Sequence, residues 1–175
     1  MNYEAYMALA LDQAAAAAAR GEFPVGCVII QDGQVMARGA RTGTGGNRLM
    51  VSEVDHAEIR ALKNLETCQQ PVVPENCTIF CTMEPCLMCY AAILLYGLGT
   101  IVYAFEDPMG GGTGCDRTSL TPLYRDSRVQ VVGGVCRQKS LDLFSKFFNK
   151  EENVYWKDSV LDIYIRKQQQ VQGKN

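Results

Sequence analysis

Apolar residues recur at helical spacing in several stretches of the chain. In the first stretch they are separated by alternating steps of four and three residues: Tyr3, Met7, Ala10, Ala14 and Ala17. This spacing places them on one face of a helix, which we expect to end at Gly21. The same periodicity predicts helices over residues 53–66, 87–96, 140–150 and 154–170.

Apolar runs rich in β-branched residues predict strands over residues 23–30, 35–37, 77–82, 100–105 and 129–132. Asp32 and Gly33 lie between the first two runs, and Asp-Gly is typical of a hairpin turn. Residues 38–50 are rich in glycine and are expected to form a long loop. The alternation of strands and helices that follows implies right-handed parallel crossovers. We therefore expect a three-layer α/β/α sandwich with a five-stranded mixed sheet.

Chain length and composition favour one domain. The chain has 175 residues, of which 47% are hydrophobic, enough for one core and too few residues for two ordinary domains. We expect the main domain to span residues 1–150 and residues 151–175 to form a helical extension of it. The formal net charge is −2. Because a protein that grips phosphates usually has a basic face, this charge mildly disfavours long contacts with nucleic acid.

The pattern contains neither a secretory signal nor a membrane span. Residues 1–11 alternate polar and apolar groups and lack a basic start, and no apolar run reaches the roughly 20 residues that span a bilayer. We therefore expect a cytoplasmic protein that does not contact membranes. In that compartment the eight cysteines are expected to be thiols or metal ligands rather than disulfides.

One histidine and a closely spaced pair of cysteines carry the candidate chemistry. His56 is the only histidine of the chain, and two residues separate Cys86 from Cys89. One imidazole and two thiolates make three zinc ligands, which leaves a fourth tetrahedral position open to water. The cysteines lie near a predicted helix start, whose positive end favours the thiolate form. This set therefore predicts a catalytic zinc site.

Glu58 lies two residues after His56 and is not needed as a fourth ligand. A carboxylate beside activated water can accept its proton and pass it to a ring nitrogen and a departing group. The combination of His-x-Glu with Pro-Cys-x-x-Cys is a signature of zinc deaminases. The alternatives are a structural zinc site or a redox pair for the cysteines and a packed core position for the histidine. The remaining cysteines have no such partners and are interpreted as core or surface thiols: Cys27, Cys68, Cys77, Cys81, Cys115 and Cys136.

The sequence resembles the cytidine deaminase superfamily, and within it the tRNA adenosine deaminases with their nucleoside and guanine deaminase relatives. The matching segments are residues 23–26, 56–58, 82–89, 91–92 and 101–103. The resemblance implies a cytidine deaminase-like fold and a homodimer, with zinc on His56, Cys86 and Cys89 and with Glu58 as the proton shuttle. We expect the substrate contacts to come from Ala57, Val25, Glu84, Pro85 and Asn47.

Two departures from the family pattern leave the substrate open. Family members usually place an asparagine soon after the second strand, where it contacts the nucleoside, but residues 39–42 read Gly-Ala-Arg-Thr here. Either Arg41 or Asn47 is a candidate replacement. Relatives that act on tRNA often end in a strongly basic helix, whereas residues 150–175 contain five basic and four acidic residues, a net charge of +1. The hypotheses are adenosine in tRNA, a free nucleobase or nucleoside, and a non-catalytic zinc-stabilised partner subunit.

The glycine-rich residues 106–115 follow a predicted strand at the end where α/β sites open. They fit neither the dinucleotide-binding pattern nor the P-loop pattern. We interpret them as a flexible wall of the base pocket, with plain tight turns as the alternative.

Overall fold

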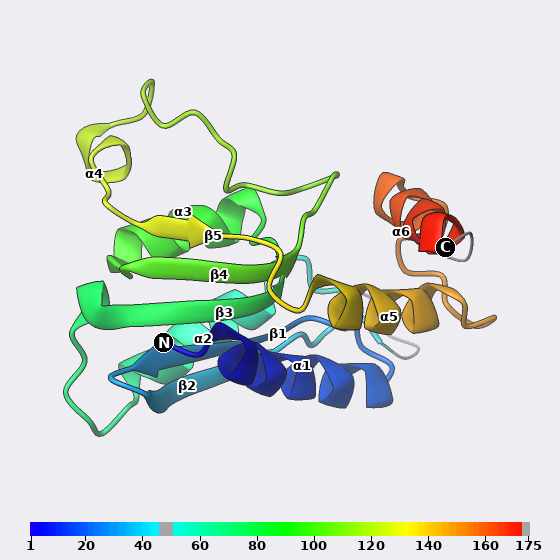
Figure 1. Cartoon of the computed structure of the whole chain (residues 1–175), viewed down its shortest axis with the longest axis horizontal. Coiled ribbons are helices and arrows are strands. Elements are labelled where there is room, and N and C mark those ends of the chain that lie inside the picture. The colour runs from blue at the N-terminus through cyan, green and yellow to red at the C-terminus, as the bar shows by residue number, and fades with distance from the viewer. Residues whose placement is uncertain (46–50, 173–175) are drawn as a thin grey trace.

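The computed structural model describes residues 1–45 and 51–172 and contains a five-stranded sheet between two layers of helices (Figure 1). The strands are β1 (Gly26–Gln31), β2 (Gln34–Ala40), β3 (Cys77–Met83), β4 (Thr100–Phe105) and β5 (Gln130–Val132). Their order in the sheet is β2-β1-β3-β4-β5. β1 is antiparallel to both of its neighbours, while β3, β4 and β5 are parallel to one another. The predicted mixed sheet and three-layer fold are confirmed.

Two helices cover each face of the sheet (Figure 1). They are α1 (Tyr3–Ala19) and α5 (Arg137–Phe148) on one face and α2 (Ala57–Glu66) and α3 (Leu87–Tyr96) on the other. The short helices η1 (Pro74–Asn76) and α4 (Pro122–Arg125) lie in connections, and α6 (Val160–Gln172) packs on α5. None of the described helices combines the length and the apolar character that crossing a membrane requires.

Two glycines let helices lie directly on the β1–β2 hairpin. A Cβ on Gly26 in β1 would overlap backbone atoms of Ala10 and Ala14 in α1. A Cβ on Gly39 in β2 would overlap the carbonyl oxygen of Ala57, the first residue of α2. Because residue 39 has no side chain, the start of α2 lies against the end of β2, and this contact positions the residues that begin α2.

Several element boundaries differ from the prediction. β2 continues to Ala40, whose Cα pairs with that of Gly26, so the first part of the expected loop at residues 38–50 is strand. α2 begins at Ala57 instead of residue 53 because His56 is its N-cap, in an extended conformation (φ −70°, ψ 155°). α5 begins at Arg137 instead of residue 140.

The C-terminal segment differs most from the prediction, which placed a helix over residues 154–170. α6 begins only at Val160, because Trp156 and Asp158 have φ angles of 52° and 60°, which a right-handed helix excludes. Leu161 and Ile165 of α6 are buried in the main hydrophobic core. The turns before α6 leave the Trp156 side chain against Phe23, at a ring distance of 5.7 Å.

Candidate metal centre and substrate pocket

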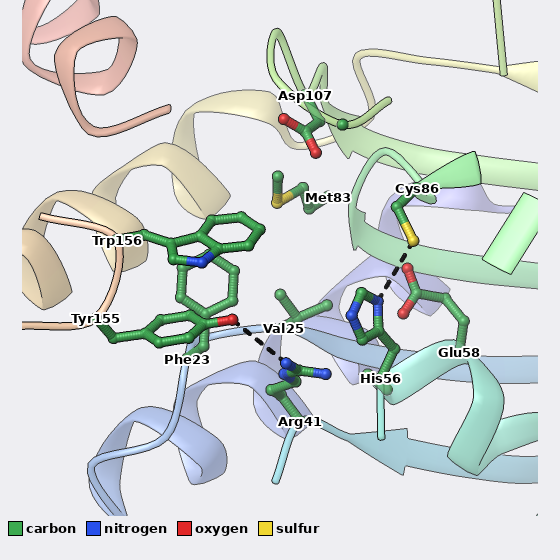
Figure 2. A pocket seen from close by; sticks show the side chains of 12 residues that line it. Phe23, Val25, Arg41, His56, Glu58, Met83, Cys86, Asp107, Tyr155 and Trp156 are labelled. Atoms are coloured by element: carbon green, nitrogen blue, oxygen red, sulfur yellow. Dashed lines mark hydrogen bonds between the residues drawn. The ribbon is translucent and has the colours of Figure 1, made fainter. Parts of the chain in front are cut away.

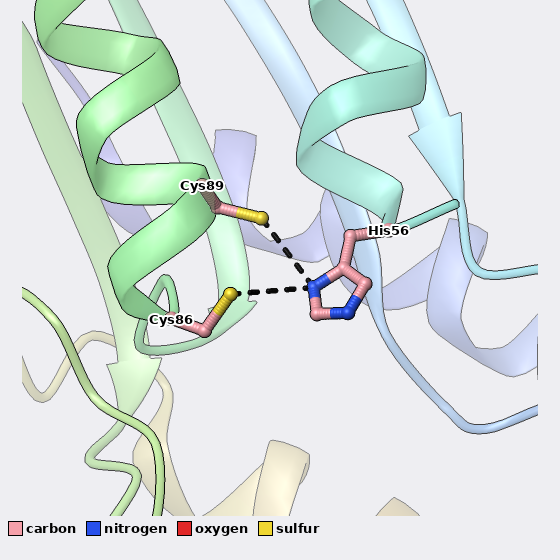
Figure 3. Close-up of side chains that lie close together, drawn as sticks. All are labelled: His56, Cys86 and Cys89. Carbon is pink, nitrogen blue, oxygen red and sulfur yellow. Dashed lines mark hydrogen bonds between the residues drawn. The ribbon is translucent and has the colours of Figure 1, made fainter. Parts of the chain in front are cut away.

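His56, Cys86 and Cys89 converge at the beginnings of two helices (Figure 3). His56 is the N-cap of α2, Cys86 is the N-cap of α3, and Cys89 follows one turn into α3. The two sulfur atoms lie 3.5 and 3.4 Å from Nδ1 of His56. Zinc with bonds of about 2.3 Å to sulfur and about 2.05 Å to nitrogen, at a tetrahedral angle, separates the two atoms by about 3.6 Å. The donor types and spacing therefore fit zinc.

The electrostatics of the cysteine pair also suit a cation. The pKa of Cys86 is lowered to about 4, most strongly by its hydrogen bond with Cys89 and also by its hydrogen bond with His56. Burial acts in the opposite direction. The hydrogen bond between the two cysteines raises the pKa of Cys89. Zinc binding requires both sulfur atoms as thiolates and would release any proton that they hold. Burial lowers the pKa of His56, but the hydrogen bond with Cys86 and the charge of Glu58 outweigh burial, so that this pKa is raised.

Glu58 lies in the first turn of α2 and is almost fully buried, with 3% of the residue exposed. Figure 2 shows its carboxyl group beside Cys86 and His56. Its Oε2 atom has no hydrogen-bond partner among the described residues. Burial, the largest influence, raises the pKa of Glu58 above its usual value. A buried carboxylate with a free oxygen and a raised pKa can both accept and return a proton.

Cys27 and Cys81 have a partner that the sequence did not reveal. Their sulfur atoms and a carboxylate oxygen of Glu58 all lie within 4.8 Å of one another, because Cys27 of β1 pairs with Cys81 of β3. Burial raises the pKa of both thiols. Both residues have no exposed surface, and we interpret the pair as an uncharged, buried packing surface beside Glu58.

A cavity of about 470 Å³, measured out to open solvent, lies above the metal-ligand cluster (Figure 2). Five of the predicted residues line it: His56, Ala57, Glu58, Cys86 and Val25. Cys89 lies behind them, with no exposed surface. Asp107 and Gly110 also line the cavity, so the glycine-rich loop forms part of its wall, as the sequence predicts.

Two other predicted substrate contacts, Glu84 and Pro85, do not line the cavity. The backbone N–H groups of Asp107 and Thr113 each donate to the Glu84 carboxylate, both at 3.1 Å. Glu84 therefore fixes the glycine-rich loop, and neither Glu84 nor Pro85 is among the described residues that line the cavity. Asn47 lies outside the described residues.

The sequence analysis named Arg41 as a candidate substrate contact but did not identify the rest of the outer wall of the cavity. Phe23, Tyr155, Trp156 and Met83 form that wall together with Arg41. The rings of Tyr155 and Trp156 stack at 5.2 Å, and Phe23 meets both (Figure 2). The pattern assigned Trp156 to a helix face. Two adjacent aromatic residues, Tyr155 and Trp156, could have indicated this wall. The C-terminal extension is too short to bury them by itself, so they must pack against the main domain.

Comparison with known proteins places the chain in a family. The family model for the cytidine and deoxycytidylate deaminase zinc-binding region matches residues 1–105. The tRNA-specific adenosine deaminase of Bacillus subtilis is 30% identical over 151 residues, which cover 84% of this chain and 89% of that protein. The corresponding protein of Haemophilus influenzae is 32% identical over 149 residues, covering 84% and 83%.

Solved structures agree with this placement. A structure from studies of A-to-I editing by tRNA:A34 deaminases superimposes with a TM-score of 0.66 at 31% identity, covering 79% of this chain and 98% of that one. A guanine deaminase from Nitrosomonas europaea has the same TM-score of 0.66 at 20% identity, covering 82% and 83%, and shows the shared fold. The chain therefore belongs to the cytidine and deoxycytidylate deaminase family and is a zinc-dependent hydrolase that acts on the C–N bond of an amino-heterocycle.

Proposed function

We propose that His56, Cys86 and Cys89 bind one zinc ion and that Glu58 transfers protons during hydrolytic deamination of a nucleobase. One observation supports this assignment most strongly. Three donors of the right types converge at the base of a cavity, beside a buried carboxylate whose Oε2 atom has no partner among the described residues. The spacing of the donors matches tetrahedral zinc.

When bound, zinc supplies the Lewis acidity that makes water a nucleophile near neutral pH. Glu58 takes a proton from the attacking water and passes it to the adjacent ring nitrogen. It then takes the second proton from the hydroxyl that has been added to the ring carbon and delivers it to the departing amino group. The new C–O bond replaces the C–N bond, and the products are an oxo-heterocycle and ammonia. The apolar and aromatic wall excludes other water and flanks the ring.

Adenosine in tRNA is the first candidate substrate. The relatives that match 84% of this chain are named for that activity, and the family model for the zinc-binding region spans all three proposed ligands. An extruded base would enter the cavity while its neighbouring nucleotides lie on the surrounding loops. A tRNA substrate would also place the protein in the cytoplasm.

A free nucleobase or nucleoside is the second candidate, and the C-terminal segment favours it. Tyr155 and Trp156 form one wall of the cavity, next to the metal-ligand cluster. A wall so close to the reaction leaves less room for a polynucleotide than an open surface would. The formal net charge of −2 agrees with a small substrate.

We further propose a homodimer formed through α3. Apolar side chains cover this helix on all sides, and three of them are exposed: Leu87, Met88 and Leu95, at 58%, 37% and 62%. Contiguous exposed apolar residues mark interaction surfaces. Since α3 also carries Cys86 and Cys89, a partner seated there would stabilise the metal site. The burial of Leu161 and Ile165 supports treating residues 151–172 as part of the same domain.

Metal analysis and a substrate panel test the proposed function. Purified protein is expected to contain one zinc ion per chain and to release ammonia from one class of substrate: adenosine in tRNA, read as inosine by sequencing, or free bases and nucleosides. Inosine in tRNA with untouched nucleosides supports the first candidate, and the reverse supports the second. A protein with one zinc ion per chain that turns over neither class would contradict catalysis and favour the non-catalytic subunit.

A further inference from the structure

Arg41 is a buried cation with unused hydrogen-bond donors in the substrate pocket. Only 2% of the residue is exposed, and it lines the cavity. Its Nε and Nη1 atoms are buried and have no hydrogen-bond partner among the described residues. In Figure 2 its guanidinium group lies between the Tyr155 hydroxyl and the His56 ring.

The remaining nitrogen of Arg41 is well fixed. Nη2 donates to the carbonyl oxygen of Ser52 at 2.7 Å and to the hydroxyl of Tyr155 at 3.3 Å. That hydroxyl donates in turn to the carboxylate of Glu53 at 3.1 Å. The backbone N–H of Arg41 donates to the carbonyl oxygen of Val25 at 2.9 Å. These contacts hold the guanidinium in one orientation, while Nε and Nη1 have no partner among the described residues.

The charge of Arg41 is only partly balanced. Glu53 is 3.7 Å away, and its side chain is 56% exposed, so solvent weakens the attraction. A buried cation with unpaired donors is costly unless an acceptor meets it. None of the described residues that line the cavity, the carboxylates of Glu58 and Asp107 included, accepts a hydrogen bond from Nε or Nη1 of Arg41, so the missing acceptor is best supplied by the bound substrate.

We propose that Arg41 recognises an oxygen acceptor on the substrate, either a carbonyl oxygen of the ring or an anionic oxygen attached to the nucleoside. This inference rests on the proposed deaminase function and specifies which heterocycles the pocket selects. Arg41 acts as a specificity residue, while Tyr155 orients it. A pocket that offers a fixed donor rejects ligands without the matching acceptor, because the donor is then buried unpaired.

Binding of matched ligand pairs tests the proposal. Each pair differs in one oxygen-bearing group: cytosine with 4-aminopyrimidine, guanine with 2-aminopurine, and adenosine 5′-monophosphate with adenosine. Affinities are measured by calorimetry on zinc-loaded Glu58→Gln protein, so that turnover does not interfere. We expect the oxygen-bearing member of at least one pair to bind about 10-fold more tightly or better, and Arg41→Gln to reduce this preference to about 2-fold or less.

The three pairs separate the two sources of the acceptor. A preference that depends on Arg41 in the first or second pair identifies a ring carbonyl, and one in the third pair identifies a phosphate. Arg125→Gln is the matched control, because it removes the same charge at an exposed pair with Asp126 and is expected to preserve the preference. Tyr155→Phe, which removes only the orienting hydroxyl, is expected to weaken it.

Folding of the variants is checked by thermal unfolding. If Arg41→Gln does not fold, Arg41→Lys serves instead, because it keeps the charge and lacks the Nε and Nη1 donors. The affinity ratio within the pair is expected to fall by about 5-fold or more in this variant. Two results would overturn the proposal. One is a folded Arg41 variant that keeps the full preference in every pair, and the other is a protein with Arg41 intact that binds both members of every pair equally well. Ammonia release by the wild-type enzyme reports separately on the proposed function, so the two can fail independently.

Discussion

The two ends of the substrate pocket are built in different ways. The inner end comes from the starts of α2 and α3, where His56, Glu58, Cys86 and Cys89 occur within two short segments. The outer end gathers Phe23, Arg41 and the pair at residues 155 and 156 from three distant parts of the chain. Reaction chemistry therefore depends on local motifs, whereas substrate selection depends on how the whole chain packs.

The largest expected effect is at the inner end. Replacing a proposed ligand, Cys89→Ser, should remove bound zinc and reduce ammonia release by more than about 1,000-fold, because water then lacks activation. Zinc content and ammonia release measure both effects. Cys115→Ser is the control, because Cys115 is exposed and lies outside the cluster. A Cys89→Ser protein that keeps its zinc and activity would mean that the metal is held elsewhere.

The outer end should affect binding more than chemistry. Trp156→Ala removes part of the aromatic wall and should raise KM about 10-fold while changing kcat much less, since stacking of a base on an aromatic ring contributes about 1–3 kcal/mol. Trp156→Phe keeps an aromatic ring at this position and should leave KM close to the wild-type value. Steady-state kinetics on the substrate that the panel selects provide the test. A loss confined to kcat would show that this wall takes part in the reaction step.

The anchor of α6 should have a smaller effect, on stability. The Glu106 carboxylate accepts a hydrogen bond from Nε of Arg137 at 2.9 Å and others from Nη2 of Arg137 and the hydroxyl of Tyr164 on α6. Because the Glu106 side chain is 41% exposed, Glu106→Gln should lower the unfolding free energy by only about 1 kcal/mol, or Tm by about 2–4 °C. An unchanged Tm would show that the core contacts of α6 hold it alone.

The smallest effect is the pH dependence of the same anchor. Hydrogen bonds from Arg137 and Tyr164 lower the pKa of Glu106 to about 2, below about 4.3 in an unfolded chain. A carboxyl group with a depressed pKa stabilises the fold above the unfolded value, and this stability is lost as pH falls through the folded value. The Tm difference between wild type and Glu106→Gln should be constant above about pH 5 and shrink toward pH 2. A difference that instead grew on acidification would contradict this assignment.

The sequence predicted most of what depends on local pattern. The hairpin at Asp32-Gly33, the helix over residues 87–96 and the strand over residues 100–105 are confirmed, because periodicity and turn residues determine them. Boundaries were wrong where tertiary contacts decide them. β2 runs on to Ala40 because it pairs with β1, and the turns before α6 place Trp156 against Phe23 instead of on a helix.

The candidate site was predictable to the same degree. The metal-ligand set follows from residue type and spacing, and the structure brings all three side chains together. The sequence analysis predicts Glu84 as a substrate contact, but its carboxylate accepts backbone hydrogen bonds from the glycine-rich loop. The hydrogen bond that joins Arg41 to Tyr155, 114 positions away in the chain, is one that no local pattern reveals.

Zinc content and ammonia release of Glu58→Gln, measured on the same sample, test most directly whether Glu58 transfers protons rather than binds the metal. The predicted result is one zinc ion per chain, as in the wild type, with turnover reduced by about 100- to 10,000-fold. Wild-type turnover, or loss of the zinc along with the activity, would contradict the role assigned to Glu58.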